Sequence, residues 1–419
     1  MDSRPTTAPS STTVSSTTVP STTVSSSALP VPPDSAAVVV VGAGPAGLTA
    51  GIVLAEAGVD VLLLDQQAEG ANTSRACAVH ARTLEVLAEL DLADELRRHG
   101  LVVPTFTVGS GGRTLASIDF GELPTAFPFM LMIPQNVTES VLLARLLAAG
   151  GKIFRHCRVT GHTDDGAGVT VGYVDGEGTA GTLRTEYLIG ADGMHSTVRE
   201  QAGIGFVGDA YASSFVLADV RLDWPLGRDR ASGFLTPEGM AVVVPLPDGG
   251  ADNRYRVVAT VTEAPQHPGV EDVEAVLDGC GLRGEVKVGE LLWSSRFRVH
   301  HRLAEHYRSG RVLLAGDAAH VHSPAGGQGM NTGIQDAVVL GRLLVRVLAG
   351  EPESVLDGYE TTRRPVAEGV VAMTDRMTQA ATLRSRPARA LRNAGIRLAT
   401  RIPSVRRKVA YQLAELSFR

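Results

Sequence analysis

The feature that most constrains this chain is an apolar strand, a glycine-rich turn and a helix in direct succession near its start. Residues 38–41 are four consecutive valines, the turn Gly42-x-Gly44-x-x-Gly47 follows at once, and an alanine- and leucine-rich stretch then runs to Gly58. A second apolar run comes after Gly58. Two apolar strands that bracket a helix indicate a parallel sheet that is buried on both faces. The sequence therefore predicts a βαβ unit.

The three glycines of this turn have separate roles at a dinucleotide site. The first allows a tight turn, the second lets the backbone approach a pyrophosphate, and the third lets the helix pack closely on the strand. The positive end of the helix favours phosphate, and Asp65, after the second strand, can accept hydrogen bonds from a ribose. Together they predict a dinucleotide site. Residues 203–208 match the same glycine pattern but follow a helix-like stretch, so we interpret them as a linker.

A second glycine-rich segment, late in the chain, favours FAD over NAD. Asp317 follows a predicted strand over residues 311–315, so its carboxylate projects from the carboxyl edge of the sheet, where α/β proteins bind ligands. There it can accept hydrogen bonds from the ribityl hydroxyls of a flavin. The glycines between Pro324 and Asn331 can turn backbone N–H groups toward a ligand. The helix expected from about Asn331 directs its positive end at the same place.

Between these segments the pattern changes. Residues 206–292 contain short alternating or apolar runs separated by Pro and Gly, which indicates an antiparallel sheet. We therefore expect an α/β protein in which a Rossmann-like FAD-binding domain with a parallel sheet is interleaved with an antiparallel β-sheet substrate domain and followed by helices. The predicted segments are a disordered Ser/Thr/Pro-rich tail at 1–35, the discontinuous FAD-binding domain at 36–105, 131–205 and 293–375, the substrate domain at 106–130 and 206–292, and C-terminal helices at 376–419.

Composition excludes several classes of function. The 39 basic and 45 acidic residues give a net charge of -6, which argues against a nucleic-acid partner. The three cysteines show neither paired nor metal-ligand spacing, so we expect a cytoplasmic protein that binds no metal. No run approaches the roughly 20 apolar residues of a membrane span, so no membrane partner is expected. The arginine-rich residues 376–419 are interpreted as surface helices with a solvated face.

Three motifs together resemble those of the FAD-dependent aromatic hydroxylases, the family of para-hydroxybenzoate hydroxylase and the polyketide hydroxylases. The motifs are Gly42-x-Gly44-x-x-Gly47, Gly190-x-Asp192-Gly193-x-x-Ser196-x-x-Arg199, and Gly316-Asp317-x-x-His320 with residues 324–331. The resemblance covers residues 36–375. It implies a single-component monooxygenase, monomeric or homodimeric, that uses NADPH or NADH and O2. Its substrate would be a phenolic or polyketide-like aromatic compound, hydroxylated through a flavin C4a-hydroperoxide.

The resemblance also implies roles for single residues. Arg75 and Gln135 would contact the FAD phosphates and ribityl chain, and the region of Asp192 would serve both FAD and the transient NAD(P)H. The residues expected to bind the cofactor are Gly42, Gly44, Pro45, Ala46, Gly47, Asp65, Gln66, Arg75, Gln135, Asp192, Asp317, Pro324, Gly327, Gln328, Gly329, Met330 and Asn331. The expected walls of the substrate pocket are Phe234, Met240, Val243 and Pro324. No catalytic side chain is expected, because the flavin carries the chemistry.

Other functions stay open at this point. The chain could be a flavin-dependent halogenase or another FAD oxidoreductase of related fold. Such halogenases carry a Trp-x-Trp-x-Ile-Pro segment, however, and Trp224 and Trp293 are far apart. It could also be a non-catalytic flavin redox sensor, in which no substrate would stimulate NAD(P)H turnover. Four histidines lie near the motifs and could act as a base on a phenol or serve only the structure. They are His80, His195, His320 and His322.

Overall fold

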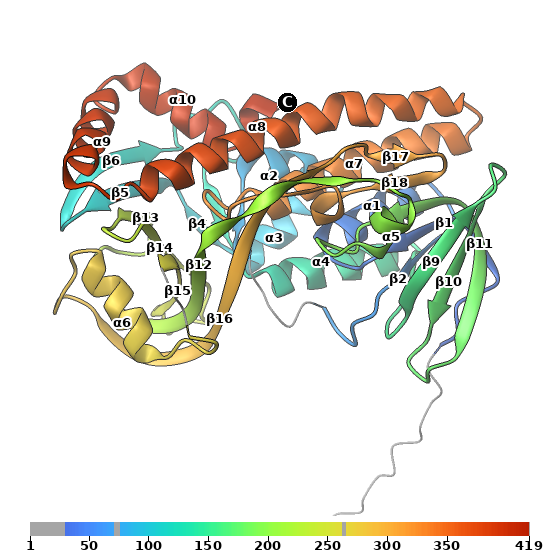
Figure 1. Cartoon of the computed structure of the whole chain (residues 1–419), viewed down its shortest axis with the longest axis horizontal. Helices are drawn as coiled ribbons and strands as arrows, with labels where there is room; N and C mark the ends of the chain where they lie inside the picture. Colours follow the sequence, from blue (N-terminus) through green and yellow to red (C-terminus); the bar gives the residue numbers. More distant parts are fainter. Residues whose placement is uncertain (1–29, 71–75, 262–264, 419) are drawn as a thin grey trace, which may run out of the picture. The chain divides into compact units, whose positions relative to one another are not determined.

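The computed structural model describes residues 30–70, 76–261 and 265–418. The chain divides into two units, Met1–Pro30 and Val31–Arg419. All the helices and strands of the described residues belong to the second unit (Figure 1). Most of the tail predicted at residues 1–35 lies outside the described residues, and Ser35 already begins the first strand. No helix in the described ranges is long and apolar enough to cross a membrane.

The first sheet contains the predicted βαβ unit. Within the described residues it has eight strands, with the order β17-β18-β11-β1-β2-β8 and with β10 and β9 added beside β11. The strands are β1 (Ser35–Val41), β2 (Val61–Leu64), β8 (Lys152–Phe154), β9 (Arg158–Asp164), β10 (Val169–Val174), β11 (Ala180–Gly190), β17 (Arg308–Ser309) and β18 (Val312–Leu314). From β18 to β8 neighbouring strands are parallel. Strands β2 and β18 consist wholly of buried apolar residues, and the valines of β1 are buried too, as the valine run predicts.

Helices pack on this sheet so closely that small residues are needed between them. The helices of this region are α1 (Pro45–Glu56), α2 (Ala81–Ala88), α3 (Ala93–His99), α4 (Gln135–Ala148), α5 (Thr197–Gln201), α7 (Gly329–Leu348) and α8 (Asp357–Ala381). A Cβ atom placed on Gly341 of α7 would lie 2.8 Å from Val53 of α1. A Cβ on Gly51 would lie 2.8 Å from Leu63 of β2. These glycines let α1 lie between α7 and the sheet.

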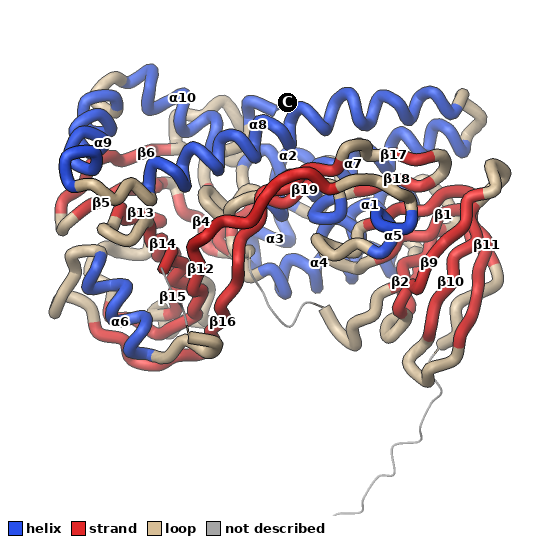
Figure 2. Tube along the Cα trace, in the orientation of Figure 1, coloured by secondary structure: helices blue, strands red, loops and turns tan. Residues whose placement is uncertain are grey.

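The second sheet is formed mainly by the middle of the chain. Counted over the described residues it has eight strands in the order β19-β16-β12-β15-β14-β13-β5-β6. Its strands are β5 (Thr105–Ser110), β6 (Arg113–Asp119), β12 (Phe206–Asp223), β13 (Arg230–Leu235), β14 (Met240–Pro245), β15 (Arg254–Val261), β16 (Lys287–Ala304) and β19 (His320–Val321). The long strands β12 and β16 run side by side toward the first sheet (Figure 2). A small third sheet joins β3 (Ala78–Val79), β7 (Met130–Met132) and β4 (Leu101–Val103).

Two details of the second sheet differ from the sequence prediction. The pairing is antiparallel except between β13 and β5, which are parallel. The region also contains a helix, α6 (Val270–Gly279), that was not predicted. Val273 and Leu277 of α6 are buried in the core beneath the sheet. Their spacing of one helical turn is the signal that could have predicted it.

The arginine-rich end of the chain forms helices whose arginines are mostly exposed, in keeping with the predicted surface helices, and only its last turn is buried. It forms α9 (Arg386–Ala399), α10 (Pro403–Leu413) and a short 3₁₀ turn, η3 (Leu416–Phe418). On α9 the leucines face outward, with Leu391 76% exposed, while Arg392 turns inward and donates to the carbonyl oxygen of Ala380 at 2.9 Å. Beyond α10 the chain becomes buried, since Glu415 is 1% exposed. The last turn is therefore part of the packed interior.

Candidate functional site

The glycine turn between β1 and α1 has the shape that a dinucleotide requires. Gly42 has a φ of +98°, and a Cβ there would overlap the carbonyl oxygen of Ala191. A Cβ on Gly47 would overlap the carbonyl oxygen of Gly42. Gly44 is different, because no atom lies within 4 Å of where its Cβ would be. The outer glycines are thus required by the fold, while Gly44, at the N-terminus of α1, borders a space that a phosphate group fits.

Asp65 lies at the end of β2, beside this turn. One carboxylate oxygen accepts from the backbone N–H of Ala43 at 2.6 Å, and the other accepts from that of Gln67 at 2.7 Å. Arg155 lies 3.5 Å from the same carboxylate. A carboxylate can accept about four hydrogen bonds, so Asp65 can hold the turn and still bind a ribose. Gln66 beside it is exposed.

The motif around Asp192 makes contacts within the protein. Its carboxylate accepts from the hydroxyl of Ser196 at 2.5 Å and from the N–H of Val198 at 3.2 Å, so it caps α5. Burial raises the pKa of Asp192 above its ordinary value, although these hydrogen bonds oppose the shift. Arg199, 4% exposed, donates to the carbonyl oxygen of Ala318 at 3.0 Å. The motif therefore fastens α5 to the segment that carries Asp317, and a contact of Asp192 with a cofactor stays a prediction.

Asp317 is exposed at the carboxyl edge of the first sheet, in the 3₁₀ turn η1 (Gly316–Ala318). This turn lies against both glycine-rich regions. A Cβ on Gly316 would lie 3.0 Å from the Cβ of Ala46 in the first turn of α1. A Cβ on Gly333, near the N-terminus of α7, would lie 3.1 Å from the Cα of Gly316. The fold thus brings Asp317, the turn at Gly44 and the start of α7 to one place.

The loop before α7 is built on two glycines with positive φ, Gly326 at +84° and Gly327 at +66°. We define residues 326–329 as the flavin loop, because they are predicted to meet the flavin. Gln328 and Asn331 are predicted to bind the cofactor, and both side chains are fully buried in the protein. Asn331 donates to the carbonyl oxygens of Ala78, at 2.9 Å, and of Gly327, at 2.8 Å. These two side chains shape the loop, and only backbone groups there can meet a ligand. Pro324, Gly327, Gly329 and Met330 are partly accessible.

Residues 76–80 run beside the flavin loop and are held from two sides. Gln135, at the start of α4, accepts from the N–H of Ala76 at 3.2 Å, and Asn331 accepts from the N–H of His80 at 2.8 Å. Gln135 also donates to Glu139 at 2.8 Å. Arg75, predicted to contact FAD phosphates, lies outside the described residues.

A buried ion pair from the second sheet reaches the same segment, and sequence reasoning missed it. Arg256 of β15, 1% exposed, donates to both carboxylate oxygens of Asp219 of β12, at 2.6 and 3.1 Å. A further guanidinium nitrogen donates to the carbonyl oxygen of Ala76 at 3.1 Å. Burial raises the pKa of the neighbouring Cys77 thiol, although Arg256 opposes this shift. The alternation of arginines at 254 and 256 in an apolar strand was the available signal.

The structure corrects two of the predicted pocket walls. Phe234 and Val243 are buried in the core that α6 covers, with the Phe234 ring 6.2 Å from that of Trp224. Side chains alternate between the faces of a strand, so Met240 lies on the opposite face from Val243. Arg256 pairs with Val244 in the register and shares that opposite face. Met240 therefore remains a candidate for the substrate side of the sheet, and Phe234 and Val243 do not.

The histidines near the motifs have mainly structural surroundings. His80 contacts the carbonyl oxygen of Gly326 at 2.8 Å, and burial lowers its pKa to about 4. Burial also lowers the pKa of His322 to about 4. His320 contacts Asp336 at 2.5 Å, and Arg363 donates to the other oxygen of this carboxylate at 2.6 Å. His195 is exposed. His80 and His322 are thus neutral at pH 7 beneath the loop.

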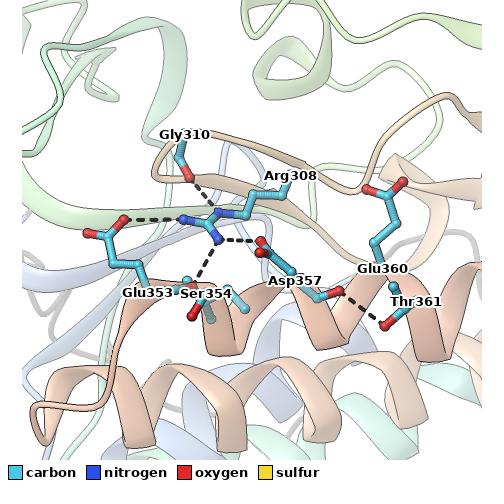
Figure 3. A pocket seen from close by; sticks show the side chains of 8 residues that line it. Arg308, Gly310, Glu353, Ser354, Asp357, Glu360 and Thr361 are labelled. Carbon is cyan, nitrogen blue, oxygen red and sulfur yellow. Dashed lines mark hydrogen bonds and ion pairs between the residues drawn. The ribbon is translucent and has the colours of Figure 1, made fainter.

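A surface pocket elsewhere on the molecule has a structural explanation. It lies between β17 and the segment of η2 (Glu353–Leu356) and α8, and Figure 3 shows the residues around it. Arg308 at its centre donates to the carbonyl oxygen of Gly310 at 2.8 Å and to Asp357 at 3.0 Å, and pairs with Glu353 at 3.3 Å. Arg308 is thus paired within the protein, and none of the lining residues belongs to the glycine turns.

Comparison with known proteins assigns the family. Residues 35–374 match a family model described as FAD binding domain. The 6-methylpretetramide 4-monooxygenase of Streptomyces rimosus is 39% identical over 391 residues, which cover 92% of this chain and 69% of that protein. The chain belongs to the flavin-dependent aromatic monooxygenases. The resemblance predicted from the three motifs is confirmed, and so is FAD as the cofactor.

Two further relatives extend this result. The pentachlorophenol 4-monooxygenase of Sphingobium chlorophenolicum is 33% identical over 82% of this chain and 64% of its own length. The crystal structure of a p-nitrophenol 4-monooxygenase from Pseudomonas putida superposes with a TM-score of 0.82 and 30% identity, covering 91% of this monooxygenase and 98% of that chain. The predicted fold class is confirmed. This chain spans about two thirds of the length of the curated relatives described here.

Proposed function

We propose that this monooxygenase binds FAD across its two glycine-rich regions and hydroxylates a phenolic or polyketide-like aromatic substrate with NADPH or NADH and O2. One observation carries the proposal, namely the close packing of Gly316 between Ala46 and Gly333. A Cβ on Gly316 would lie 3.0 Å from the Cβ of Ala46, and a Cβ on Gly333 would lie 3.1 Å from the Cα of Gly316. Three segments that are far apart in the sequence thereby form one continuous lining, from the N-terminus of α1 through Asp317 to the start of α7.

The parts of FAD can be assigned along this lining. The pyrophosphate would occupy the open space beside Gly44, and Asp65 would accept from the adenosine ribose. The exposed Asp317 would accept from the ribityl hydroxyls. Backbone N–H groups of the flavin loop, with the positive end of α7 behind them, would stabilise negative charge on the reduced ring. The residues present therefore fit FAD and favour it over FMN, which lacks the adenosine half.

The substrate would lie between the flavin loop and the face of the second sheet that carries Met240 and Arg256. Relatives named for 6-methylpretetramide, pentachlorophenol and p-nitrophenol suggest an oxygen-bearing aromatic ring. When bound, reduced flavin supplies the oxygen-transfer chemistry. The chain's own contribution is to orient the aromatic ring of the substrate, exclude water and hold substrate and flavin together.

The reductant would visit the flavin transiently. Residues 203–208, the second match to the glycine pattern, form the turn after α5 and the start of β12 in this structure, not a strand-to-helix turn. No second dinucleotide turn is thus found in the described ranges. We place the protein in the cytoplasm, as a monomer or homodimer acting on small molecules in secondary metabolism. The unpaired state of Cys77, Cys157 and Cys280 supports a reducing compartment.

The test is anaerobic stopped-flow reduction of the FAD-bound protein by NADPH and NADH, with and without a panel of phenols and fused-ring polyketides. Without O2 we expect slow reduction alone and faster reduction with a suitable aromatic compound. In separate turnovers under ¹⁸O2 we expect a product that carries one ¹⁸O atom. Reduction only by a separate flavin reductase, with chloride-dependent product, would support a halogenase instead. FAD binding without turnover for any member of the panel would support a redox sensor.

A further inference from the structure

The last turn of the chain packs against the flavin loop. We define the C-terminal turn as Leu413–Leu416; it begins at the last residue of α10, and all of it is buried. The carbonyl oxygen of Leu413 accepts from the side chain of Gln328 at 3.2 Å, and that of Ala414 accepts from the N–H of Arg82 in α2 at 3.1 Å. The C-terminal turn therefore touches both the loop and the helix beside it.

Glu415, in the middle of this turn, is an unusual residue for its position. It is 1% exposed and has a φ of +60°, a backbone conformation that is unfavourable for residues other than glycine. Its carboxyl group meets the side-chain amide of Gln335 and lies 3.4 Å from the hydroxyl of Thr332. Both partners belong to the first two turns of α7. A buried acid in a strained backbone conformation lowers the stability of the fold unless its hydrogen bonds compensate for the cost.

The contacts of Glu415 continue into the flavin loop. The N–H and the hydroxyl of Thr332 both reach the carbonyl oxygen of Gln328, at 2.9 and 3.1 Å. Burial raises the pKa of Glu415 to about 8, with Arg363 opposing and Asp336 adding to the shift. The hydroxyl of Thr332 lies within hydrogen-bond distance of both the carboxyl group of Glu415 and the carbonyl oxygen of Gln328, and it can donate to either. A chain of hydrogen bonds thus runs from the C-terminal turn to the loop.

We propose that the C-terminal turn is a clasp that sets the shape of the flavin loop, with Glu415 as its positioning residue. The clasp reaches the loop through Gln328 and Thr332. The inference rests on the proposed function in one respect, namely that residues 326–329 contact the flavin.

The experiment compares Glu415→Ala, Glu415→Gln and Thr332→Val with the full-length wild type. FAD affinity is measured by fluorescence titration of the apoprotein, and hydrogen exchange of residues 326–332 is measured without FAD. Val273→Ala is the matched control, because it removes buried side-chain atoms under α6, far from the loop in the fold. It separates general destabilisation from an effect on the loop.

We expect Glu415→Ala to weaken FAD binding tenfold or more and to speed exchange of residues 326–332. Glu415→Gln keeps a neutral hydrogen-bonding group and should stay within about twofold of wild type, and Thr332→Val should fall between them. Val273→Ala should lower the melting temperature and leave affinity and loop exchange unchanged. If Glu415→Ala does not fold, Thr332→Val decides in its place. Wild-type affinity and exchange in the deciding variant would overturn the clasp.

A separate measurement tests the assumption beneath the clasp. In the wild type, added FAD should protect residues 326–331 from exchange. If Glu415→Ala speeds exchange of the loop but FAD does not protect the wild-type loop, the clasp is supported and the placement of the flavin is refuted. If FAD protects the wild-type loop but Glu415→Ala has no effect on it, the placement of the flavin is supported and the clasp is refuted.

Discussion

The ion pair between Asp219 and Arg256 offers the sharpest quantitative prediction. Both side chains are almost completely buried, at 4% and 1% exposure, and three donor–acceptor contacts join this carboxylate to Arg254 and Arg256 within 3.1 Å. Asp219→Ala removes the counter-ion and leaves a guanidinium in the interior. Breaking a buried pair in this way typically costs about 3–5 kcal/mol. We expect a loss of that size in the free energy of unfolding of the second sheet.

The assay follows from the position of the tryptophans. The sequence contains two, and both pack on the second sheet: Trp293 is opposite Asp219 in the β12–β16 register, and the Trp224 ring is 5.8 Å from that of Tyr255 of β15. Urea unfolding of the apoprotein, followed by tryptophan fluorescence, therefore reports on this sheet. The apoprotein is used so that bound FAD does not add to the measured stability.

Two comparisons make the result decisive. Asp60→Ala breaks the ion pair with Lys152, whose side chains are 53% and 52% exposed, and should cost at most about 1 kcal/mol. The double variant Asp219→Ala with Arg256→Met replaces the buried charges with apolar atoms and should recover most of the loss. If Asp219→Ala costs no more than Asp60→Ala, the buried pair does not stabilise the sheet and our account of it is wrong.

Three further predictions concern the cofactor site and the acid at the chain end. Gly44→Val should abolish FAD binding and leave the melting temperature of the apoprotein unchanged, whereas Gly47→Val should lower that melting temperature. If both variants change the melting temperature of the apoprotein equally, our account of the turn's geometry is wrong. Asp317→Ala should weaken FAD binding roughly tenfold to a hundredfold in a fluorescence titration, the effect of losing hydrogen bonds to a charged acceptor worth about 1.5–3 kcal/mol. Glu415 has a pKa of about 8 when folded and about 4.5 when unfolded, so its folded form holds a proton that the unfolded chain releases between these values. The contribution of Glu415 to the free energy of unfolding should thus be greatest below pH 4.5 and should fall by on the order of 3–5 kcal/mol as the pH rises toward 8. In urea titrations at several pH values, Glu415→Gln should show a weaker dependence on pH than the wild type.

The sequence predicts best where one short segment contains the whole signal. The turn from Gly42 to Gly47 requires its glycines for reasons of local geometry, so the strand, helix and phosphate site follow from a few adjacent residues. The start of α7 is similar, since the glycines before it and the apolar period within it define both the loop and the helix. The family resemblance and FAD depended on such segments, and the comparisons confirm both.

The features that the sequence did not predict depend on which face of an element is covered. Alternation along β13 and β14 separates two faces but does not say which one α6 packs on, so Phe234 and Val243 were assigned to the wrong side. Asn331 shows the same limit within a motif, because a polar side chain beside a ligand loop can point to the ligand or fasten the loop. The link from Arg256 to Ala76 joins residues far apart in the chain, and no local pattern reveals it.

The path of the chain through residues 312–321 has a mechanical consequence. Strand β18 belongs to the first sheet and β19 to the second, and only the 3₁₀ turn that carries Asp317 and its two flanking alanines lie between them. If the second sheet rotates about the first when a substrate enters, the backbone of residues 315–319 must absorb the rotation. Asp317 then sits at the hinge itself, so the carboxylate proposed to hold the ribityl chain would move whenever the two halves of the enzyme change their angle.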